Sequence, residues 1–377
     1  MPDVYGSTRA GGTPWLARFE EEIAAKLGKE AAIWVPSGTM AQGIVLCCAQ
    51  KVKLGIDRTP ALPRLRRPFF AHPTSHLLLW EEEAHQRLLD IPCITVGAKD
   101  RPLVSADLEV ALNAAMDLAS GPAALILEVP QREIGGETTP WTEIKKLRQL
   151  CSEQRVWMHM DGARLWEILP FYEDTHGVGC HELLSMFDSV YVSFYKGLGS
   201  SLPGAVLAGD AAFVSEARVW LRRFGGNLYT AMPVALSALD SFRREEGTFR
   251  EKWKTMEQFV LAVQQAVAAL PELGDGDSEY VRFTPPIPEC GMCHCHILGE
   301  KSAIEAACER TAVDTGMRIF RSLRGDSILG PKWQYFEWSI GPVNSMNSPS
   351  DIRKAWQHFL ICLHEKKASD PGDPPAT

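Results

Sequence analysis

Short apolar runs alternate with amphipathic segments over roughly the first 240 residues of the chain. Residues 123–129 are almost entirely apolar, which is typical of a strand buried on both faces of a parallel sheet. Residues 15–27 instead place apolar side chains three or four positions apart, as one face of a helix does. The alternation predicts an α/β fold with a mostly parallel, doubly wound sheet of about seven strands. These strands are expected at residues 31–35, 69–71, 94–96, 123–129, 156–160, from 189 onward, and at 205–209.

Further helical patterns are expected at residues 77–89 and 231–270. After residue 271 the pattern changes to short strands separated by helices, which predicts a smaller α+β domain. Its strands are expected at residues 280–283, 293–298 and 335–340, and its helices at 302–315 and 350–366. The resulting division is an arm at 1–14, a large domain at 15–240, a small domain at 241–367 and a disordered, Pro- and Asp-rich tail at 368–377.

Composition narrows the classes of function. The 377 residues are 45% hydrophobic and 23% charged, with a formal net charge of −8. No large basic block appears, so a nucleic-acid partner is not expected. The sequence shows no apolar run of about 18 residues and no signal segment, so we expect no membrane partner and a cytoplasmic enzyme acting on a small molecule.

Two polar residues stand where expected strands end. Asp161 follows the strand at 156–160, and Lys196 follows the strand that begins at Ser189. Ligands of open α/β sheets bind beyond the carboxyl ends of the strands, so both side chains are expected to face one site. A lysine can form a Schiff base with pyridoxal 5'-phosphate (PLP), and an aspartate can keep its pyridine nitrogen protonated. Together they predict a PLP site, whereas either residue alone would suit an ordinary surface position.

Two further segments fit such a site. Ser37, Gly38 and Thr39 lie between an expected strand and an expected helix, where free backbone N–H groups can hold a phosphate. Simple N-capping by Ser37 or Thr39 is the alternative. His76 follows the short strand at 69–71 and is a candidate to stack on the cofactor ring or to move protons, with a cap or surface role as the alternative.

Two histidine-containing segments remain open or are set aside. His159 shares a strand face with Asp161, so it either contacts the aspartate or packs in the core. Residues 290–296 read CGMCHCH, which suggests zinc at first sight. A single C-x-x-C without a second pair is a weak signal, and alternation on a strand separates the cysteines from the histidines. We therefore expect no metal in this protein.

Three motifs in order, SGTMA at residues 37–41, DGAR at 161–164 and KGLG at 196–199, resemble the threonine aldolase / β-eliminating lyase family of PLP enzymes. The resemblance extends over about residues 4–240 and implies the aspartate-aminotransferase-like fold, fold type I. It also implies a homodimer or homotetramer with shared active sites.

The resemblance assigns roles by position. Lys196 would form the Schiff base, Asp161 would pair with the pyridine nitrogen, and His76 would stack on the ring and take part in acid–base steps. The cofactor-binding set is then Ser37, Gly38, Thr39, Asp161, Arg164, Ser193 and Lys196.

The sequence differs from the family pattern at two positions. Gln131 stands where the family carries a second histidine near the substrate hydroxyl, and Glu337 stands where a late-strand arginine grips the substrate carboxylate. Substrate binding is therefore expected to involve Gln131 and one or more of Arg9, Arg132, Arg164 and Arg223.

The expected reaction is Cα–Cβ cleavage of a β-hydroxy-α-amino acid to glycine and an aldehyde. The alternatives are β-elimination or another carbon–carbon or carbon–sulfur cleavage on a different amino acid, and a PLP-fold protein without catalysis.

Overall fold

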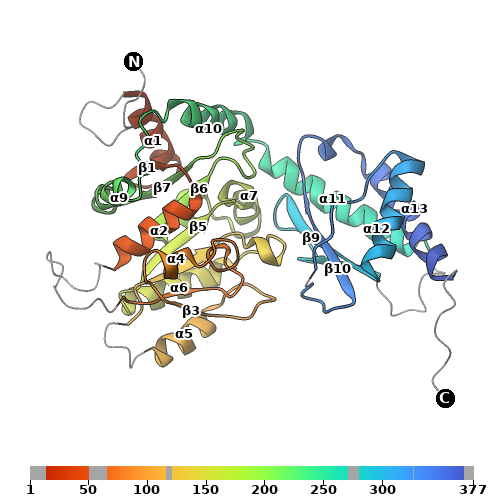
Figure 1. The fold of residues 1–377 in the computed structure, drawn as a ribbon, viewed down its shortest axis with the longest axis horizontal. Helices are drawn as coiled ribbons and strands as arrows, with labels where there is room; N and C mark the ends of the chain where they lie inside the picture. Colours follow the sequence, from red (N-terminus) through yellow and green to blue (C-terminus); the bar gives the residue numbers. More distant parts are fainter. Residues whose placement is uncertain (1–13, 51–65, 116–120, 271–279, 326, 369–377) are drawn as a thin grey trace. The chain divides into compact units, whose positions relative to one another are not determined.

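The computed structural model describes residues 14–50, 66–115, 121–270, 280–325 and 327–368 (Figure 1). Arg9, the expected arm apart from Pro14, and the expected tail apart from Ala368 lie outside the described residues. Contacts divide the chain into two compact units, Met1–Glu133 with Thr138–Phe249, and Ile134–Glu137 with Arg250–Thr377. The sequence places this division near residue 240, which lies within helix α10 (Met232–Glu245).

Seven strands form the sheet of the first unit: β1 (Ala31–Val35), β2 (Phe69–Ala71), β3 (Cys93–Thr95), β4 (Ala124–Glu128), β5 (Trp157–Gly162), β6 (Ser189–Ser193) and β7 (Ala205–Gly209). Their order across the sheet is β1-β7-β6-β5-β4-β2-β3 (Figure 1). The strands from β6 to β3 pair in parallel, and β7 runs antiparallel to both of its neighbours. The mostly parallel α/β sheet predicted from the sequence is confirmed.

Helices connect these strands, and several begin or end at residues that suit the position. Ser37 caps α2 by accepting the backbone N–H of Met40, and Asp210 caps α9 by accepting that of Phe213. Gly177 ends α7 with a left-handed φ of 68°. Besides α10, the helices of this unit are α1 (Pro14–Lys26), α2 (Gly38–Ala49), α3 (His76–Leu79), α4 (Ala84–Arg87), α5 (Ser105–Ala114), α6 (Trp141–Glu153), α7 (Leu165–His176), α8 (Cys180–Ser185) and α9 (Ala211–Arg223), and the 3-10 helix η2 (Arg132–Ile134) begins in it.

Three residues form a row across the centre of the sheet. Glu128 on β4 is in register with Asp161 on β5, and Asp161 is in register with Tyr191 on β6. Residues in register on neighbouring parallel strands point to the same face, so these three side chains are neighbours. All three are buried. The sheet therefore gathers two carboxyl groups and a phenol near the carboxyl ends of its central strands.

The helix α2 is held against the sheet by apolar packing. Ile44 of α2, Val214 of α9 and Leu207 of β7 belong to one cluster of buried apolar residues. The first turn of α2 also lies close to Tyr191, because a Cβ atom built on Gly38 would come 2.2 Å from the Tyr191 hydroxyl oxygen. A side chain at residue 38 would therefore push the start of α2 away from the row.

The second unit contains a three-stranded antiparallel sheet in the order β10-β9-β8, made of β8 (Val281–Thr284), β9 (Met292–Leu298) and β10 (Trp333–Ser339). Three long helices accompany it, α11 (Phe249–Ala268), α12 (Lys301–Thr315) and α13 (Pro349–Ala368), with the 3-10 helix η4 (Asn344–Met346). Phe259, Trp338, Trp356 and Phe359 lie at the centre of its apolar core.

Two of the expected helices are interrupted. The run at 77–89 forms α3 and α4, because Glu82 and Glu83 adopt left-handed φ angles of 49° and 57° that end a right-handed helix. The run at 231–270 forms α10 and α11, with a break at 246–248 that contains Gly247. Glycine has a low helix propensity, which suits a break at this place. Helical periodicity alone revealed neither interruption.

Among the described residues, no helix combines the length and the apolar character that crossing a membrane would require.

Replacing Phe359 by alanine is expected to lower the free energy of unfolding of the second unit by about 3–5 kcal/mol, because the fully buried ring leaves a cavity. Chemical denaturation followed by tryptophan fluorescence measures the change. Val313→Ala is the control, since Val313 is 83% exposed and its loss should cost under about 0.5 kcal/mol. Equal effects of the two substitutions would contradict the assignment of this core.

Candidate active site

A pocket in the first unit opens at the carboxyl ends of β4, β5 and β6 and at the start of α2. The structure brings seven of the residues predicted from the sequence into its lining, namely Gly38, Thr39, His76, Asp161, Arg132, Arg164 and Lys196. The other lining residues are Gln42, Glu81, Glu128, Pro130, Ala163, Tyr191 and Tyr195.

The carboxyl group of Asp161 lies at the bottom of the site and is only 4% exposed. Its Oδ2 accepts a hydrogen bond from Gln42 Nε2 at 2.8 Å, and its Oδ1 accepts one from the backbone N–H of Ala163 at 3.1 Å. Burial, and next the nearby charge of Glu128, raise the pKa of Asp161 to about 7. The site thus contains an acid whose ionised form is disfavoured by burial, and a cationic ring nitrogen would stabilise that form.

His76 begins α3 and faces a set of acids. Its Nδ1 lies 3.4 Å from Glu81 Oε1, and its backbone N–H donates to Glu128 Oε2 at 3.2 Å. The hydrogen bond with Glu81 is the main cause of a raised pKa for His76, and Asp161 and Glu128 act in the same direction. Burial raises the pKa of Glu128. The imidazole is therefore placed to hold a proton in the pocket.

Lys196 lies three residues beyond the end of β6. Its Nζ is 5.2 Å from the centre of the Tyr195 ring, within the range of a cation–π contact. The following residue must be small, because a Cβ on Gly197 would come 2.4 Å from Glu167 Oε1. Glu167 is itself fixed by Arg164, whose Nη1 lies 3.0 Å from Glu167 Oε1. The start of α7 thus positions the segment that carries the lysine.

The turn at residues 37–39 shows the N-capping that the sequence offered as one of two interpretations. Ser37 caps α2, with its hydroxyl oxygen accepting the N–H of Met40 at 3.3 Å. Gly38 and Thr39 line the pocket, whereas Ser37 lines a neighbouring apolar pocket. Gly38 and Thr39 stand in the first turn of a 12-residue helix, and a helix start of this kind can bind phosphate.

Three other candidates lie outside this lining, and a fourth is not among the described residues. Gln131 is 2% exposed and its side-chain N–H donates to Thr74 Oγ1 at 2.6 Å, with His72 as a second partner, so it does not line the pocket. Arg223 ends α9, outside the pocket lining, with its guanidinium 4.4 Å from the centre of the Trp220 ring. Ser193 is the buried last residue of β6 and also lies outside the lining. Arg9 is outside the described residues.

His159 contacts Ser189 rather than Asp161. Its Nδ1 lies 2.7 Å from Ser189 Oγ on the neighbouring strand, and complete burial lowers its pKa to about 3. His159 is therefore a neutral histidine packed between strands. The side chain that donates a hydrogen bond to Asp161 is that of Gln42.

Glu337 and the CGMCHCH segment both lie in the second unit. Glu337 is in register with His294 and has a carboxylate oxygen 3.9 Å from an Arg324 nitrogen. Cys293 and Cys295 point into the apolar core, whereas His296 makes contacts with Thr284 Oγ1 at 3.0 Å and Ser327 Oγ at 2.8 Å. Strand alternation separates these thiols from the imidazoles, as expected.

The lining residues that sequence reasoning did not single out carry weak local signals. Glu128 is an acid that ends an otherwise apolar buried strand, and Gln42 is a polar residue within a largely apolar helix. Both are polar residues at positions where the pattern demands apolar ones, and such exceptions are the signal to look for. Glu81 and Tyr191 reach the site only through tertiary packing.

The fold and this pocket define the class of PLP-dependent enzymes of fold type I. The sequence matches the family model described as β-eliminating lyase over residues 4–284, so the chain belongs to the β-eliminating lyase family.

Individual relatives agree with this membership. The chain is 30% identical over 227 residues to the probable low-specificity L-threonine aldolase 2 of Arabidopsis thaliana, covering 58% of each chain. A crystal structure of a proposed L-allo-threonine aldolase from Listeria monocytogenes EGD-E superposes with a TM-score of 0.79 and 31% identity, over 97% of this chain and 89% of that one. A crystal structure of a proposed aromatic amino acid β-eliminating lyase/threonine aldolase from Exiguobacterium sp. 255-15 superposes with a TM-score of 0.79 and 30% identity, over 96% of this chain and 90% of that one. The match thus spans less than two thirds of the Arabidopsis protein.

Asp161→Asn is expected to raise the melting temperature of the cofactor-free protein, by an amount that grows with pH. The folded pKa of Asp161, about 7, lies above its ordinary value of 3.8, so the folded state binds a proton more tightly than the unfolded state. The wild type therefore loses stability as pH rises from about 4 to about 7, and the asparagine variant lacks this loss. Thermal unfolding across this pH range measures the difference.

Asp240→Asn is the matched control, because the Asp240 side chain is 78% exposed on α10. A gap between the Asp161→Asn variant and the wild type that stays constant with pH would contradict the raised pKa.

Proposed function

We propose that this protein is a PLP-dependent lyase that cleaves the Cα–Cβ bond of a β-hydroxy-α-amino acid to glycine and an aldehyde. The observation that carries the proposal is the presence of Lys196 and the deeply buried Asp161 in the lining of one pocket, at the ends of neighbouring strands. The names of the relatives, which include L-threonine and L-allo-threonine aldolases, support this reaction and substrate class.

The residues present fit the cofactor. Asp161 would pair with the pyridine nitrogen, whose positive charge compensates the buried carboxylate. Lys196 Nζ would hold the aldehyde carbon, and the backbone N–H groups of Gly38 and Thr39 would hold the phosphate at the start of α2. Gln42 keeps the carboxylate of Asp161 oriented through its 2.8 Å hydrogen bond.

When bound, PLP supplies a conjugated ring that accepts the electron pair released at Cα. The protein's own groups then control protons. Lys196 would hold the aldehyde carbon of the cofactor, and Asp161 would keep the ring nitrogen protonated. His76 takes the proton of the β-hydroxyl group, so that the oxygen electrons form the C=O bond of the aldehyde as the Cα–Cβ bond breaks. The proton taken from the hydroxyl balances the one that Cα gains in glycine.

Binding of the substrate carboxylate is assigned to Arg132 and Arg164, the two arginines in the described lining of the pocket. Each is restrained by an acid, Arg132 by Glu133 at 2.8 Å and Arg164 by Glu167 at 3.0 Å. Restraint of this kind orients the planar guanidinium group before the substrate arrives, which suits two-point binding of a carboxylate.

The central test is a product assay with Lys196→Ala. The wild-type protein with PLP is expected to show the visible absorption of lysine-bound PLP and to release equal amounts of glycine and aldehyde from a 3-hydroxy amino acid such as threonine. Lys196→Ala should lose both properties, because no other group supplies the amine at that position. Lys301→Ala, which changes an exposed lysine, should keep them. Release of ammonia and a 2-oxo acid in place of glycine would contradict the proposed reaction.

The role of His76 predicts a defined change in the pH profile. As a base His76 must be neutral, so activity rises as pH passes its pKa, and the contact with Glu81 raises that pKa. Glu81→Gln should therefore move the acidic limb of kcat/KM to lower pH.

Glu83→Gln is the matched control, because this acid belongs to the same run but its exposed side chain pairs with Arg87. An acidic limb that stays in place in Glu81→Gln, or moves equally in both variants, would show that His76 is not the group whose titration limits activity.

A further inference from the structure

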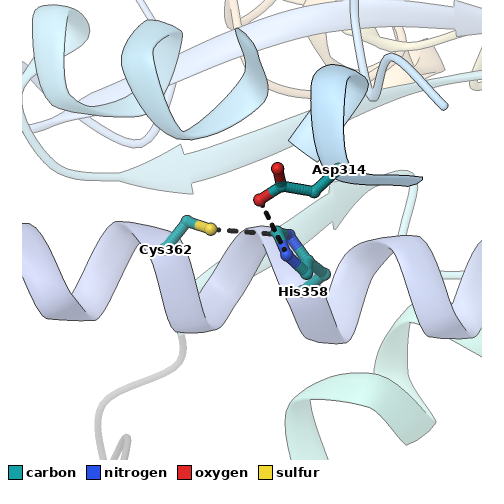
Figure 2. A group of neighbouring side chains, drawn as sticks. All are labelled: Asp314, His358 and Cys362. Atoms are coloured by element: carbon teal, nitrogen blue, oxygen red, sulfur yellow. Dashed lines mark hydrogen bonds and ion pairs between the residues drawn. The ribbon is translucent and has the colours of Figure 1, made fainter. Parts of the chain in front are cut away.

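Three potential metal ligands come together in the second unit, on two neighbouring helices (Figure 2). His358 and Cys362 are one turn apart on α13 and therefore lie on the same face of the helix. Asp314 is in the last turn of α12, and Figure 2 shows its carboxylate pointing at the His358 ring. One ligand atom from each residue lies within 4.8 Å of the others.

The contacts of His358 suit a tetrahedral site. Cys362 Sγ lies 3.4 Å from His358 Nδ1. Zinc bonds of roughly 2.0–2.1 Å to nitrogen and about 2.3 Å to sulfur, at a tetrahedral angle, put the two ligand atoms about 3.5 Å apart. The thiol and the imidazole are thus already at the separation that one ion needs. Asp314 Oδ2 lies 3.2 Å from the other ring nitrogen, His358 Nε2. To join an ion held by His358 Nδ1 and Cys362 Sγ, the carboxylate would have to turn away from Nε2.

The surroundings favour a cation at this place. The C-terminal end of a helix carries partial negative charge, so the carboxylate of Asp314 is poorly placed there without positive charge nearby. Arg310 lies 3.7 Å from Asp314 but makes a shorter contact with Glu365, at 2.8 Å. Two carboxylates therefore share one arginine, and the negative charge of an ionised Cys362 would add to the excess.

The same three residues could be read as a nucleophile, a base and an orienting acid, but their exposure argues against this. The Cys362 residue is only 5% exposed. A nucleophile needs contact with a substrate, whereas a metal ligand needs contact only with the ion. The side chains of His358 and Asp314 are 33% and 42% exposed, so an ion and a water ligand can approach from solvent.

We propose that Asp314, His358 and Cys362 form a zinc-binding site in the second unit, with water as the fourth ligand. One nitrogen, one sulfur and one oxygen are a ligand set that zinc accepts in tetrahedral geometry, and thiolate favours zinc over magnesium or calcium. Binding replaces the thiol proton of Cys362, which passes to solvent, and requires no oxidant or reductant. The proposal departs from the expectation from the sequence that the protein holds no metal.

Cobalt(II) titration of the full chain, treated first with a chelator and freed of it, tests the site. One cobalt per chain should bind and give the near-ultraviolet absorption of a cobalt–thiolate bond, and added zinc should remove this band. Cys362→Ser should abolish the band. His358→Gln and Asp314→Asn should each weaken cobalt binding at least about tenfold. Loss of a residue that only supports a ligand already weakens metal binding by about this factor, so loss of a ligand itself should weaken it at least as much.

Cys308→Ser is the matched control, because Cys308 is a buried thiol of α12 whose Sγ contacts Phe320 O rather than the cluster. It should keep the full band. Asp314 is exposed, so Asp314→Asn tests the site even if Cys362→Ser fails to fold, as judged by circular dichroism. A thiolate band that persists in folded Cys362→Ser, cobalt binding unchanged in Asp314→Asn, or no thiolate band in the wild type would each overturn the proposal.

Discussion

The burial of one carboxyl group governs the chemistry of the first unit. Asp161 sits in register between Glu128 and Tyr191 on the three central parallel strands, away from water. Charging it there is costly, and two hydrogen bonds, from Gln42 and from the backbone of Ala163, offset only part of that cost. The strands, the start of α2 and the start of α7 all contribute to this environment. The same packing that makes a stable parallel sheet thus creates a site that favours a positively charged partner.

The acids around His76 also affect protonation in the pocket, because they raise the pKa of its imidazole. Glu128 accepts the backbone N–H of His76 while Glu81 contacts its ring, so one histidine is oriented from two directions. Glu128 also lies beside Asp161 and raises its pKa. One buried acid therefore influences both the group assigned to the ring nitrogen and the group assigned to proton transfer.

Much of this could be predicted from the sequence, because strands that end in polar residues meet at one edge of a parallel sheet. Asp161, Lys196 and Gly38 were found in this way, and the mostly parallel sheet follows from apolar periodicity. Gln131 and Arg223 were assigned by position in the chain, but side-chain direction and distance depend on packing that periodicity does not encode. Glu81 lines the pocket but was not predicted as a site residue, because it belongs to an acidic run that resembles a solvated helix face. Left-handed residues immediately after it interrupt the helix, and it contacts His76 in the pocket.

The burial of Asp161 has a consequence for how a cofactor would enter the site. With a pKa of about 7, the group is about half protonated near neutral pH, so the cofactor-free protein carries a mobile proton at the bottom of its pocket. A basic ring nitrogen arriving there can receive that proton directly from Asp161. Where Asp161 is protonated, the exchange would leave an ion pair in place of a neutral acid. Because the pKa of Asp161 lies near neutrality, the share of molecules able to supply this proton falls as pH rises.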